Sequence, residues 1–150
     1  MGGNGVVVGI DATTEMLDVA RAKHADADAD LLLADATCLP LAPGSVDAIF
    51  AAGLLTHVPD PDELLRTMAR VARLGCRLAL FHPIGRAVLA ARHGRALASD
   101  ELLDPSVLTD VLTATGWVPE HIDDSDHRYL AIAQVASDRR DRDDAEIAPP

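Results

Sequence analysis

Two aspartates follow short apolar runs, and their carboxylates could bind a ligand. Asp11 ends the run from Val6 to Ile10, and Asp35 ends the run from Leu31 to Ala34. Such runs are typical of buried parallel strands, and open α/β sheets bind ligands at the carboxyl ends of their strands. The pattern therefore predicts that both carboxylates contact a ligand. A strand-terminal aspartate can instead cap the segment after it, and this structural role stays open for both.

Other polar clusters have simpler explanations. Residues 121–127, HIDDSDH, combine carboxylates with imidazoles, but a hairpin turn rich in Asp and Ser accounts for them without a metal. Cys38 and Cys76 are too far apart for a CxxC motif. We therefore expect two buried, reduced thiols and no metal site.

The basic residues gather in one short segment. Arg86, Arg92, His93 and Arg95 lie in the predicted helix 84–99. Their guanidinium groups could recognise an acidic part of a substrate. A solvated helix face is the favoured interpretation.

The elements that position these residues alternate between strand and helix. Apolar runs predict strands at 6–11, 31–35, 46–52, 77–81, 117–122 and 129–135. A helix at 14–24 connects the first two strands, and the acidic turn 123–126 joins the last two into an antiparallel hairpin. The pattern indicates an α/β fold with a mostly parallel sheet and an antiparallel hairpin at its C-terminal edge.

Two further helices carry strong start signals. Asp60, Pro61 and Glu63 are typical of a cap, a first helical position and a capping box, and Gly75 is expected to end this helix. Asp104 and Pro105 begin the second helix in the same way, and Gly116 is expected to end it. The side chains expected to face the core are Leu64, Met68, Val71 and Ala72 on the first helix and Val107, Leu108, Val111 and Leu112 on the second.

Composition limits the class of protein. A chain of 150 residues, 49% of them hydrophobic, is expected to form one domain at 1–136, followed by a charged, disordered tail at 137–150. The formal net charge of −11 disfavours a role in binding nucleic acid. The longest apolar run, 48–55, is too short to cross a membrane. These features predict a cytoplasmic protein, without membrane or nucleic acid partners, that acts on small molecules.

Three stretches together point to a known family. Residues 7–17, VVGIDATTEML, look like a second strand and its helix, and residues 34–41, ADATCLPL, look like the acidic segment after a third strand. Residues 45–60, SVDAIFAAGLLTHVPD, look like a fourth strand and its loop. In this order the stretches resemble the Rossmann-like, class I S-adenosylmethionine-dependent methyltransferases, especially the type 11 methyltransferase domain. The resemblance covers about residues 6–134.

The resemblance implies S-adenosylmethionine as cofactor and a small molecule as methyl acceptor. Asp11, with Ala12 beside it, would accept hydrogen bonds from the ribose hydroxyls. Asp35 would accept from the adenine amino group, and the Ala36 amide would donate to a ring nitrogen. Met16 would give the adenine an apolar face, although an ordinary core position is its commoner role.

The same resemblance places further residues near the methyl group. Ala51 and Ala52 end the strand 46–52, where backbone carbonyls would approach the methionine part of the cofactor. His57 would face the substrate and is the candidate general base. A loop histidine bonded to backbone is the commoner alternative.

The sequence departs from the family pattern at its start. The family's glycine-rich turn follows a first strand, whereas Gly2 to Gly5 lead directly into the run at Val6. We interpret these glycines as a leader or as the end of a connecting loop. The family's first strand lies between its second and fourth, so its absence would leave unpaired strand edges. Direct pairing of those strands or a second chain would fill the gap, and a homodimer through these edges is one hypothesis.

Three functions follow from these observations. The first is a methyltransferase domain acting on a small molecule, with weak or absent cofactor binding expected of the 150-residue chain. The alternative is a non-catalytic methyltransferase-like protein that serves as a partner. A nicotinamide-dependent dehydrogenase ranks last, because it explains neither residues 34–36 nor the terminal hairpin.

Overall fold

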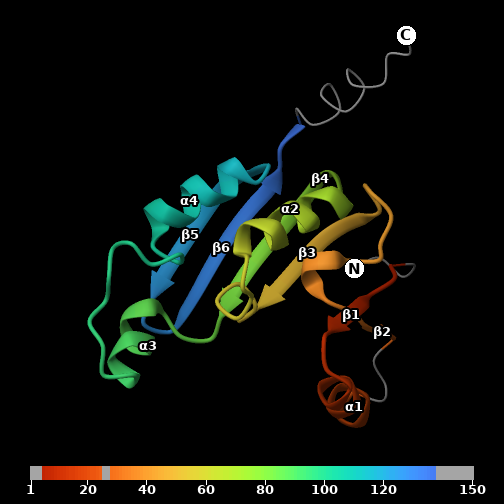
Figure 1. The fold of residues 1–150 in the computed structure, drawn as a ribbon, viewed down its shortest axis with the longest axis horizontal. Coiled ribbons are helices and arrows are strands. Elements are labelled where there is room, and N and C mark those ends of the chain that lie inside the picture. The colour runs from red at the N-terminus through yellow and green to blue at the C-terminus, as the bar shows by residue number, and fades with distance from the viewer. Residues whose placement is uncertain (1–4, 25–27, 138–150) are drawn as a thin grey trace. The chain divides into compact units, whose positions relative to one another are not determined.

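The computed structural model describes residues 5–24 and 28–137, which Figure 1 shows as a ribbon. The chain divides into two compact units, Met1–Pro40 and Leu41–Pro150. Hydrogen-bonded strands form one sheet in each unit. The α/β class is confirmed, and the expected tail lies outside the described residues from 138 onward.

The first unit is a βαβ motif. Its elements are β1 (Val8–Asp11), α1 (Thr14–Lys23), β2 (Asp30–Leu33) and the 3-10 helix η1 (Ala36–Cys38). β1 and β2 pair in parallel, with Asp11 opposite Leu33. The predicted order of strand, helix and strand is confirmed, and both strands are shorter than the predicted strands at 6–11 and 31–35.

The second unit contains a mixed sheet of four strands. Its elements are β3 (Val46–Ala52), α2 (Pro61–Val71), β4 (Ala72–His82), α3 (Arg86–Arg92), α4 (Pro105–Ala114), β5 (Trp117–Ser125) and β6 (Arg128–Val135). The strand order is β3-β4-β6-β5. β3 and β4 are parallel, and β6 is antiparallel to both of its neighbours. The predicted C-terminal hairpin is therefore present at one edge.

The core of the second unit is formed by helix side chains and the sheet. Leu64 and Leu65 of α2 and Leu108 and Leu112 of α4 are fully buried. The indole of Trp117, at the start of β5, is also buried and donates a 3.0 Å hydrogen bond to the Leu65 carbonyl. This bond satisfies the indole N–H inside the core and fixes α2 against the sheet.

Helix α2 starts as predicted and ends early. The Asp60 side chain accepts a 2.9 Å hydrogen bond from the Glu63 N–H, and the predicted apolar stripe is buried. The helix ends at Val71, because Ala72 pairs with Val46 and so joins the sheet. Gly75, expected to end the helix, lies within β4 at a φ of 86°, where the register with β3 shifts.

Helix α3 is shorter than the predicted helix 84–99. It ends at Arg92, and Gly94 follows with a φ of 63°, a conformation that glycine adopts readily. The Arg86 guanidinium donates a 2.8 Å hydrogen bond to the Ala98 carbonyl. That bond holds the segment after α3 in a loop, so the long predicted helix is wrong.

The hairpin turn is tighter than predicted. Strands β5 and β6 continue to the pair Ser125 and Arg128, so the turn at 123–126 is wrong. The Asp123 carboxylate accepts a 2.7 Å hydrogen bond from Arg128, and the Asp124 carboxylate accepts one from the Arg86 N–H. These side chains stabilise the extended strands, and they account for two of the carboxylates in the run 121–127.

Three single side chains also differ from the prediction. Cys38 is exposed, because it ends the short helix η1, whereas Cys76 is buried as expected. Met16 is 55% exposed and is not a core residue, because α1 buries Leu17 instead. Arg86 is 5% exposed and does not belong to a solvated face, because carboxylates surround it.

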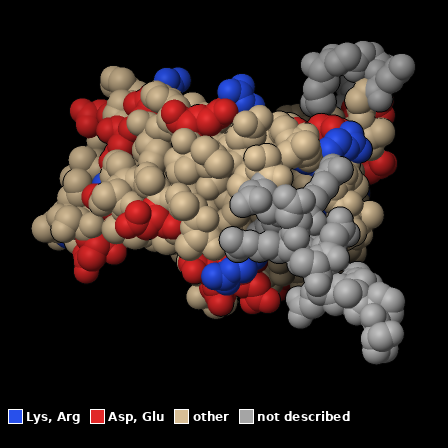
Figure 2. All heavy atoms as spheres, turned by 90° about the horizontal axis from the view of Figure 1, so that it is seen from above, with Lys and Arg blue, Asp and Glu red and all other residues tan. Residues whose placement is uncertain are grey.

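The surface carries many carboxylates. On the face in Figure 2, Asp and Glu side chains form several groups, and Lys and Arg appear as separate spots. Among the described residues, no helix has both the length and the apolar character needed to span a bilayer.

Candidate functional site

The carboxylates of Asp11 and Asp35 lie at one edge of the sheet in the first unit. Asp11 is the last residue of β1, and Asp35 follows the end of the parallel strand β2 by two residues. Oδ1 of Asp11 accepts two 2.8 Å hydrogen bonds, from the N–H and the hydroxyl of Thr13. Oδ1 of Asp35 accepts the same pair of 2.8 Å bonds from Thr37. The structure thus brings the two predicted carboxylates to one edge in matching local geometry.

These hydrogen bonds favour the charged form of both side chains. The pKa of Asp11 is lowered mainly by the Thr13 hydroxyl, and the pKa of Asp35 mainly by the Thr37 N–H. Both groups are therefore ionised at neutral pH. Because the threonine bonds end on Oδ1, Oδ2 of each carboxylate offers lone pairs to ligand hydroxyl or amino groups.

The capping role that the sequence left open for these aspartates is also present in the structure. Asp35 is the N-cap of η1, so it has the capping role that the sequence left open. The N-cap of α1 is Thr13, and Asp11 supports that residue from outside the helix. Capping uses one oxygen of each carboxylate and does not exclude ligand contact through the other.

Three more predicted cofactor residues lie in the first unit. Ala12 is exposed and links Asp11 to the start of α1, while Ala36 is half-buried as the first residue of η1. Met16, in the first turn of α1, is exposed, so its thioether can contact a ligand. Their ligand roles remain predictions.

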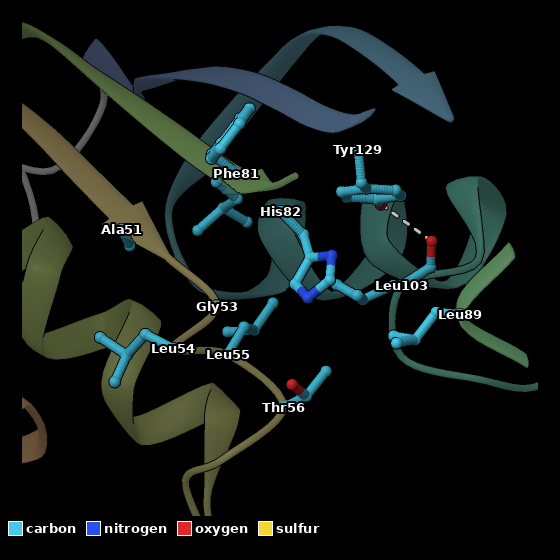
Figure 3. Close-up of a pocket in the computed structure, with 11 residues that line it drawn as sticks. Ala51, Gly53, Leu54, Leu55, Thr56, Phe81, His82, Leu89, Leu103 and Tyr129 are labelled. Atoms are coloured by element: carbon cyan, nitrogen blue, oxygen red, sulfur yellow. Dashed lines mark hydrogen bonds between the residues drawn. The ribbon is translucent and has the colours of Figure 1, made fainter. Parts of the chain in front are cut away.

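A small apolar hollow, with a cavity volume of about 30 Å³, is present in the second unit, where β3 and β4 end (Figure 3). Five leucines and Phe81 form most of its wall. The polar side chains that line it are Thr56, His82 and Tyr129. An apolar lining with few polar groups is the kind of lining that small-molecule sites have.

Tyr129 is a structural member of this wall. Its hydroxyl donates a 2.8 Å hydrogen bond to the Leu103 carbonyl, which Figure 3 shows as a dashed line. Burial, followed by the nearby Asp124 carboxylate, raises the pKa of Tyr129 far above its usual value. The phenol is therefore protonated at neutral pH and fixes the loop that carries Leu103.

The residues predicted at the end of β3 have different environments. Ala51 is buried and lines the hollow, whereas Ala52 is exposed and pairs with Phe81. The side chain of His57 is exposed, and His57 is not among the lining residues. Its N–H donates to the Leu54 carbonyl at 3.0 Å, so its backbone forms a turn.

Sequence reasoning missed His82. This histidine is the last residue of β4 and stands before Pro83, which has no N–H to continue a ladder. The available signal was its position after an apolar run, the same type of position that identified Asp11.

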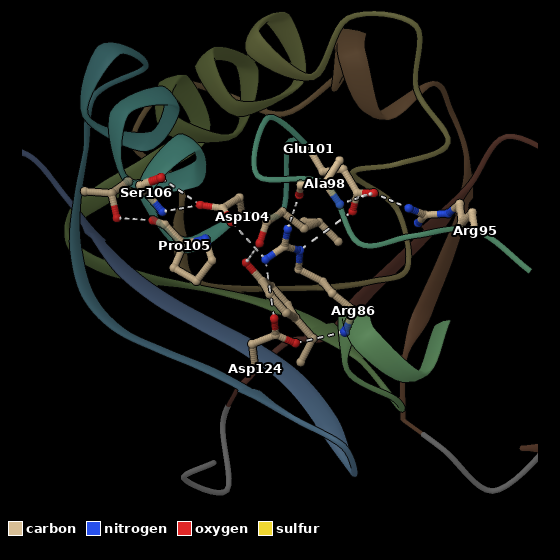
Figure 4. A network of polar contacts seen from close by, with 11 residues as sticks. Arg86, Arg95, Ala98, Glu101, Asp104, Pro105, Ser106 and Asp124 are labelled. Atoms are coloured by element: carbon tan, nitrogen blue, oxygen red, sulfur yellow. Dashed lines mark hydrogen bonds and ion pairs between the residues drawn. The ribbon is translucent and has the colours of Figure 1, made fainter. Parts of the chain in front are cut away.

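A buried arginine holds the loop beside the hollow in place (Figure 4). Nη1 of Arg86 lies 3.1 Å from the Asp104 carboxylate and 3.5 Å from that of Asp124. Its Nε lies 3.8 Å from the Glu101 carboxylate, which also pairs with Arg95. The guanidinium of Arg86 is therefore used within the fold and is not available to an acidic substrate.

Comparison with known proteins identifies the family. A family model described as "Methyltransferase domain" matches residues 1–80. The chain belongs to the methyltransferase domain family. Membership confirms the resemblance to class I methyltransferases, whose cofactor is S-adenosylmethionine.

Two proteins that are similar to this chain in sequence are named as methyltransferases. Methyltransferase GfsG of Streptomyces halstedii is 38% identical in an alignment of 87 positions that covers 55% of this chain and 31% of that protein. Demethylmenaquinone methyltransferase of Roseiflexus sp. (strain RS-1) is 30% identical in an alignment of 139 positions that covers 76% of this chain and 58% of that protein. The chain thus spans less than two thirds of either relative.

A solved structure supports the same fold. The structure of a SAM-dependent methyltransferase from Aquifex aeolicus matches with a TM-score of 0.71 and 20% identity. The match covers 90% of this methyltransferase-family chain and 71% of the other.

The residues at the β1-β2 edge fit the family's cofactor. A ribose diol and an adenine amino group are hydrogen-bond donors, and the two ionised carboxylates are acceptors. Asp11 and Asp35 therefore have the chemistry needed to hold the adenosine part of S-adenosylmethionine.

Proposed function

We propose that the chain is an S-adenosylmethionine-dependent methyltransferase domain that acts on a small-molecule acceptor. The cofactor supplies an electrophilic methyl group, and the protein contributes mainly by binding and orienting the two reactants. The observation that carries the proposal is the matched pair of carboxylates at the β1-β2 edge, each held by a threonine two residues later.

The first unit would bind the adenosine part of the cofactor. Asp11 would accept hydrogen bonds from the ribose hydroxyls, and Asp35 would accept from the adenine amino group. The Ala36 amide would donate to a ring nitrogen, and the exposed Met16 would cover one face of the ring. Ala12 would allow close approach of the ribose, because its side chain is small.

By the family resemblance, residues at the end of β3 would contact the methionine part of the cofactor. The carbonyls of Ala51 and Ala52 at the end of β3 would accept from the cofactor's amino group. Ala51 also lines the apolar hollow, which supports the hollow as the acceptor site. The leucine-rich wall favours a small apolar acceptor over a polymer.

The test is a titration of the 150-residue chain with S-adenosylmethionine, in which NMR records the chemical shifts of the backbone amides. This method suits the weak binding expected of the chain. Shifts should concentrate at residues 11–16 and 35–37. Asp11→Asn and Asp35→Asn should each weaken binding by about 10-fold or more, because each removes a charge-assisted hydrogen bond.

The matched control is Asp18→Asn. Asp18 also lies in the first unit but pairs with Arg21 on the exposed surface of α1. This variant makes the same change in charge and should leave the affinity unchanged. If Asp11→Asn, Asp35→Asn and Asp18→Asn all bound S-adenosylmethionine with the same affinity, the proposal would be wrong. The carboxylates of Asp11 and Asp35 would then contribute no more to binding than a surface carboxylate does.

Methyl transfer separates the enzyme from the non-catalytic alternative. Labelled S-adenosylmethionine is incubated with the chain and a panel of small apolar hydroxyl compounds. Transfer that Asp11→Asn reduces would support the enzyme. Cofactor binding without transfer to any acceptor would favour the methyltransferase-like partner protein.

We also propose that β3 is the edge through which two copies associate. β3 is the terminal strand of its sheet, and Phe50 on it is 68% exposed. An exposed apolar edge strand is a template for pairing with another chain. Sedimentation should find a dimer that Ala48→Lys dissociates, whereas a monomer at all concentrations would refute this part of the proposal.

A further inference from the structure

Of the polar side chains that line the hollow at the ends of β3 and β4, one is placed to exchange a proton with a ligand. Thr56 is exposed, and Tyr129 is protonated and bonded to the Leu103 carbonyl. His82 is half-buried, and Figure 3 shows its ring projecting into the hollow near Leu55 and Thr56. Among the residues that line the hollow, His82 is therefore the group suited to accept a proton.

The contacts of its ring decide which nitrogen carries the proton. Nδ1 lies 2.9 Å from the Ile84 carbonyl oxygen, and the Ile84 N–H points to the same nitrogen at the longer distance of 3.3 Å, so the closer contact to the carbonyl decides the tautomer. Two acceptors at 2.9 Å would repel each other, so we assign a proton to Nδ1, which donates to the carbonyl. The neutral ring then has its lone pair on Nε2, and this is the arrangement of a general base oriented by backbone.

The turn after β4 is held rigidly, which fixes the ring. A Cβ on Gly85 would lie 2.0 Å from the Ser125 carbonyl oxygen, so only glycine fits there. The next N–H, that of Arg86, donates a 2.8 Å hydrogen bond to Asp124. Strand pairing places His82 opposite Tyr129. The Ile84 carbonyl that orients the imidazole is thus anchored to the β5-β6 hairpin.

The wall of the hollow limits the acceptor. Five leucines and Phe81 disfavour a charged group, because burying a charge without a partner is costly. The protein's net charge of −11 further disfavours an anionic acceptor.

The choice of an imidazole as general base restricts which nucleophile can react. A general base works well when the acidities of the base and the reacting group are not far apart. A phenolic hydroxyl, with a reference pKa of about 10 in tyrosine, is much closer to imidazole than an aliphatic alcohol is. An apolar hollow with one imidazole therefore fits a neutral aromatic or enolic hydroxyl.

We infer that His82 is the general base of the acceptor site and that the acceptor is a neutral phenol or enol with an apolar body. This inference rests on the proposed function. The acceptor oxygen forms a bond to the methyl carbon as the bond from that carbon to the cofactor's sulfur breaks, and the sulfur keeps the electron pair. The O–H proton moves to Nε2 of His82 and from there to water. The products are the methyl ether, the neutral thioether and one proton.

The first test needs no cofactor. Nitrogen-15 NMR of the wild-type chain should show the ring of His82 with its proton on Nδ1. 2-Naphthol should bind about 5-fold more tightly than 2-methoxynaphthalene, which cannot donate a hydrogen bond. Equal binding of the two compounds, or a proton on Nε2 in the neutral ring, would overturn the inference.

Variants show which histidine causes the preference for 2-naphthol. His82→Phe should bind the two compounds equally, and His82→Gln serves as a second variant that keeps a polar side chain able to bond the turn. His57→Phe should keep the wild-type preference. If His57→Phe removed the preference and His82→Phe kept it, His57 would be the base and the inference would be wrong.

The second test follows methyl transfer to 2-naphthol. His82→Phe should reduce kcat by about 100-fold with little change in cofactor affinity. Transfer by His82→Phe at the wild-type rate would overturn the role as base. If the wild-type chain bound no S-adenosylmethionine, the proposed function would fail, and the naphthol preference would still decide the assignment of the hollow.

Discussion

Asp11 and Asp104 have the same local structure in two regions of the chain, with different consequences. Each carboxylate accepts hydrogen bonds through Oδ1 from the N–H and the hydroxyl of a residue two positions later, Thr13 or Ser106. At Asp104, Oδ2 accepts a 3.1 Å hydrogen bond from the buried Arg86. At Asp11, the bonds from Thr13 both use Oδ1, at the edge of the sheet.

The comparison shows that the short motif does not by itself determine the role of its carboxylate. An Asp-x-Thr or Asp-x-Ser sequence orients one oxygen in both regions. The partner of the second oxygen then decides the role. Where an arginine binds the second oxygen, the carboxylate stabilises the fold. Where the carboxylate lies at an exposed sheet edge, the second oxygen can contact a ligand.

The largest effect is expected from removing the arginine. Arg86→Met should lower the free energy of unfolding by about 3–5 kcal/mol, because it leaves Glu101, Asp104 and Asp124 without their shared cation. Urea unfolding followed by the fluorescence of the buried Trp117 measures this change.

The control for this prediction is Arg66→Met. Arg66 forms an exposed pair with Asp62 on α2, and such pairs contribute less than about 1 kcal/mol. Equal losses in the two variants would show that burial of the Arg86 cluster adds nothing, which would remove the contrast between the regions.

A smaller loss is expected at the glycine that anchors the turn. Gly85→Ala should destabilise the second unit by about 1–3 kcal/mol, because its Cβ would clash with the Ser125 backbone. Gly94→Ala has open space and only a φ of 63° to oppose it, so about 1 kcal/mol is expected there. Urea midpoints that rank the two variants in the opposite order would contradict this account of the turn.

Local sequence signals predicted much of the fold. β3 was predicted with its observed bounds, and the caps at Asp60 and Asp104 are present. Both signals come from neighbouring residues. The end of α2 was missed because Ala72 pairs with Val46, which lies 26 positions earlier in the chain.

The site was predictable only in part, for the same reason. Asp11 and Asp35 were recognised because each follows its own apolar run. The burial of Arg86 was missed because its partners Glu101, Asp104 and Asp124 follow 15 to 38 residues later. His82 was missed because its role depends on a hollow whose walls come from separate segments of the chain.

The supporting hydroxyls should give a further, smaller contrast. Thr13→Val removes one hydrogen bond to Asp11 and should weaken S-adenosylmethionine binding by about 2- to 5-fold with the urea midpoint of the second unit unchanged. Ser106→Ala should lower that midpoint and leave binding unchanged. If Ser106→Ala changed the cofactor affinity, the roles of Asp11 in binding and of Asp104 in folding would not be separate.

The smallest effect concerns stability in acid. Hydrogen bonds from Ser106, followed by the charge of Arg86, lower the pKa of Asp104 from 3.8. A lowered pKa in the folded state gives stability that is fully present above pH 3.8 and is lost as the pH falls through the folded value. Asp104→Asn should therefore lower the urea midpoint at neutral pH and flatten its decline below about pH 4. An unchanged slope in acid would show that Asp104 contributes no proton-linked stability.

The most direct test of the central claim measures two properties on Asp11→Asn and Asp104→Asn: affinity for S-adenosylmethionine by NMR titration and the urea midpoint from Trp117 fluorescence. We expect Asp11→Asn to lose affinity and keep the midpoint, and Asp104→Asn to keep affinity and lose part of the midpoint. If Asp11→Asn bound the cofactor as well as the wild type did, the β1-β2 edge would not be the cofactor site.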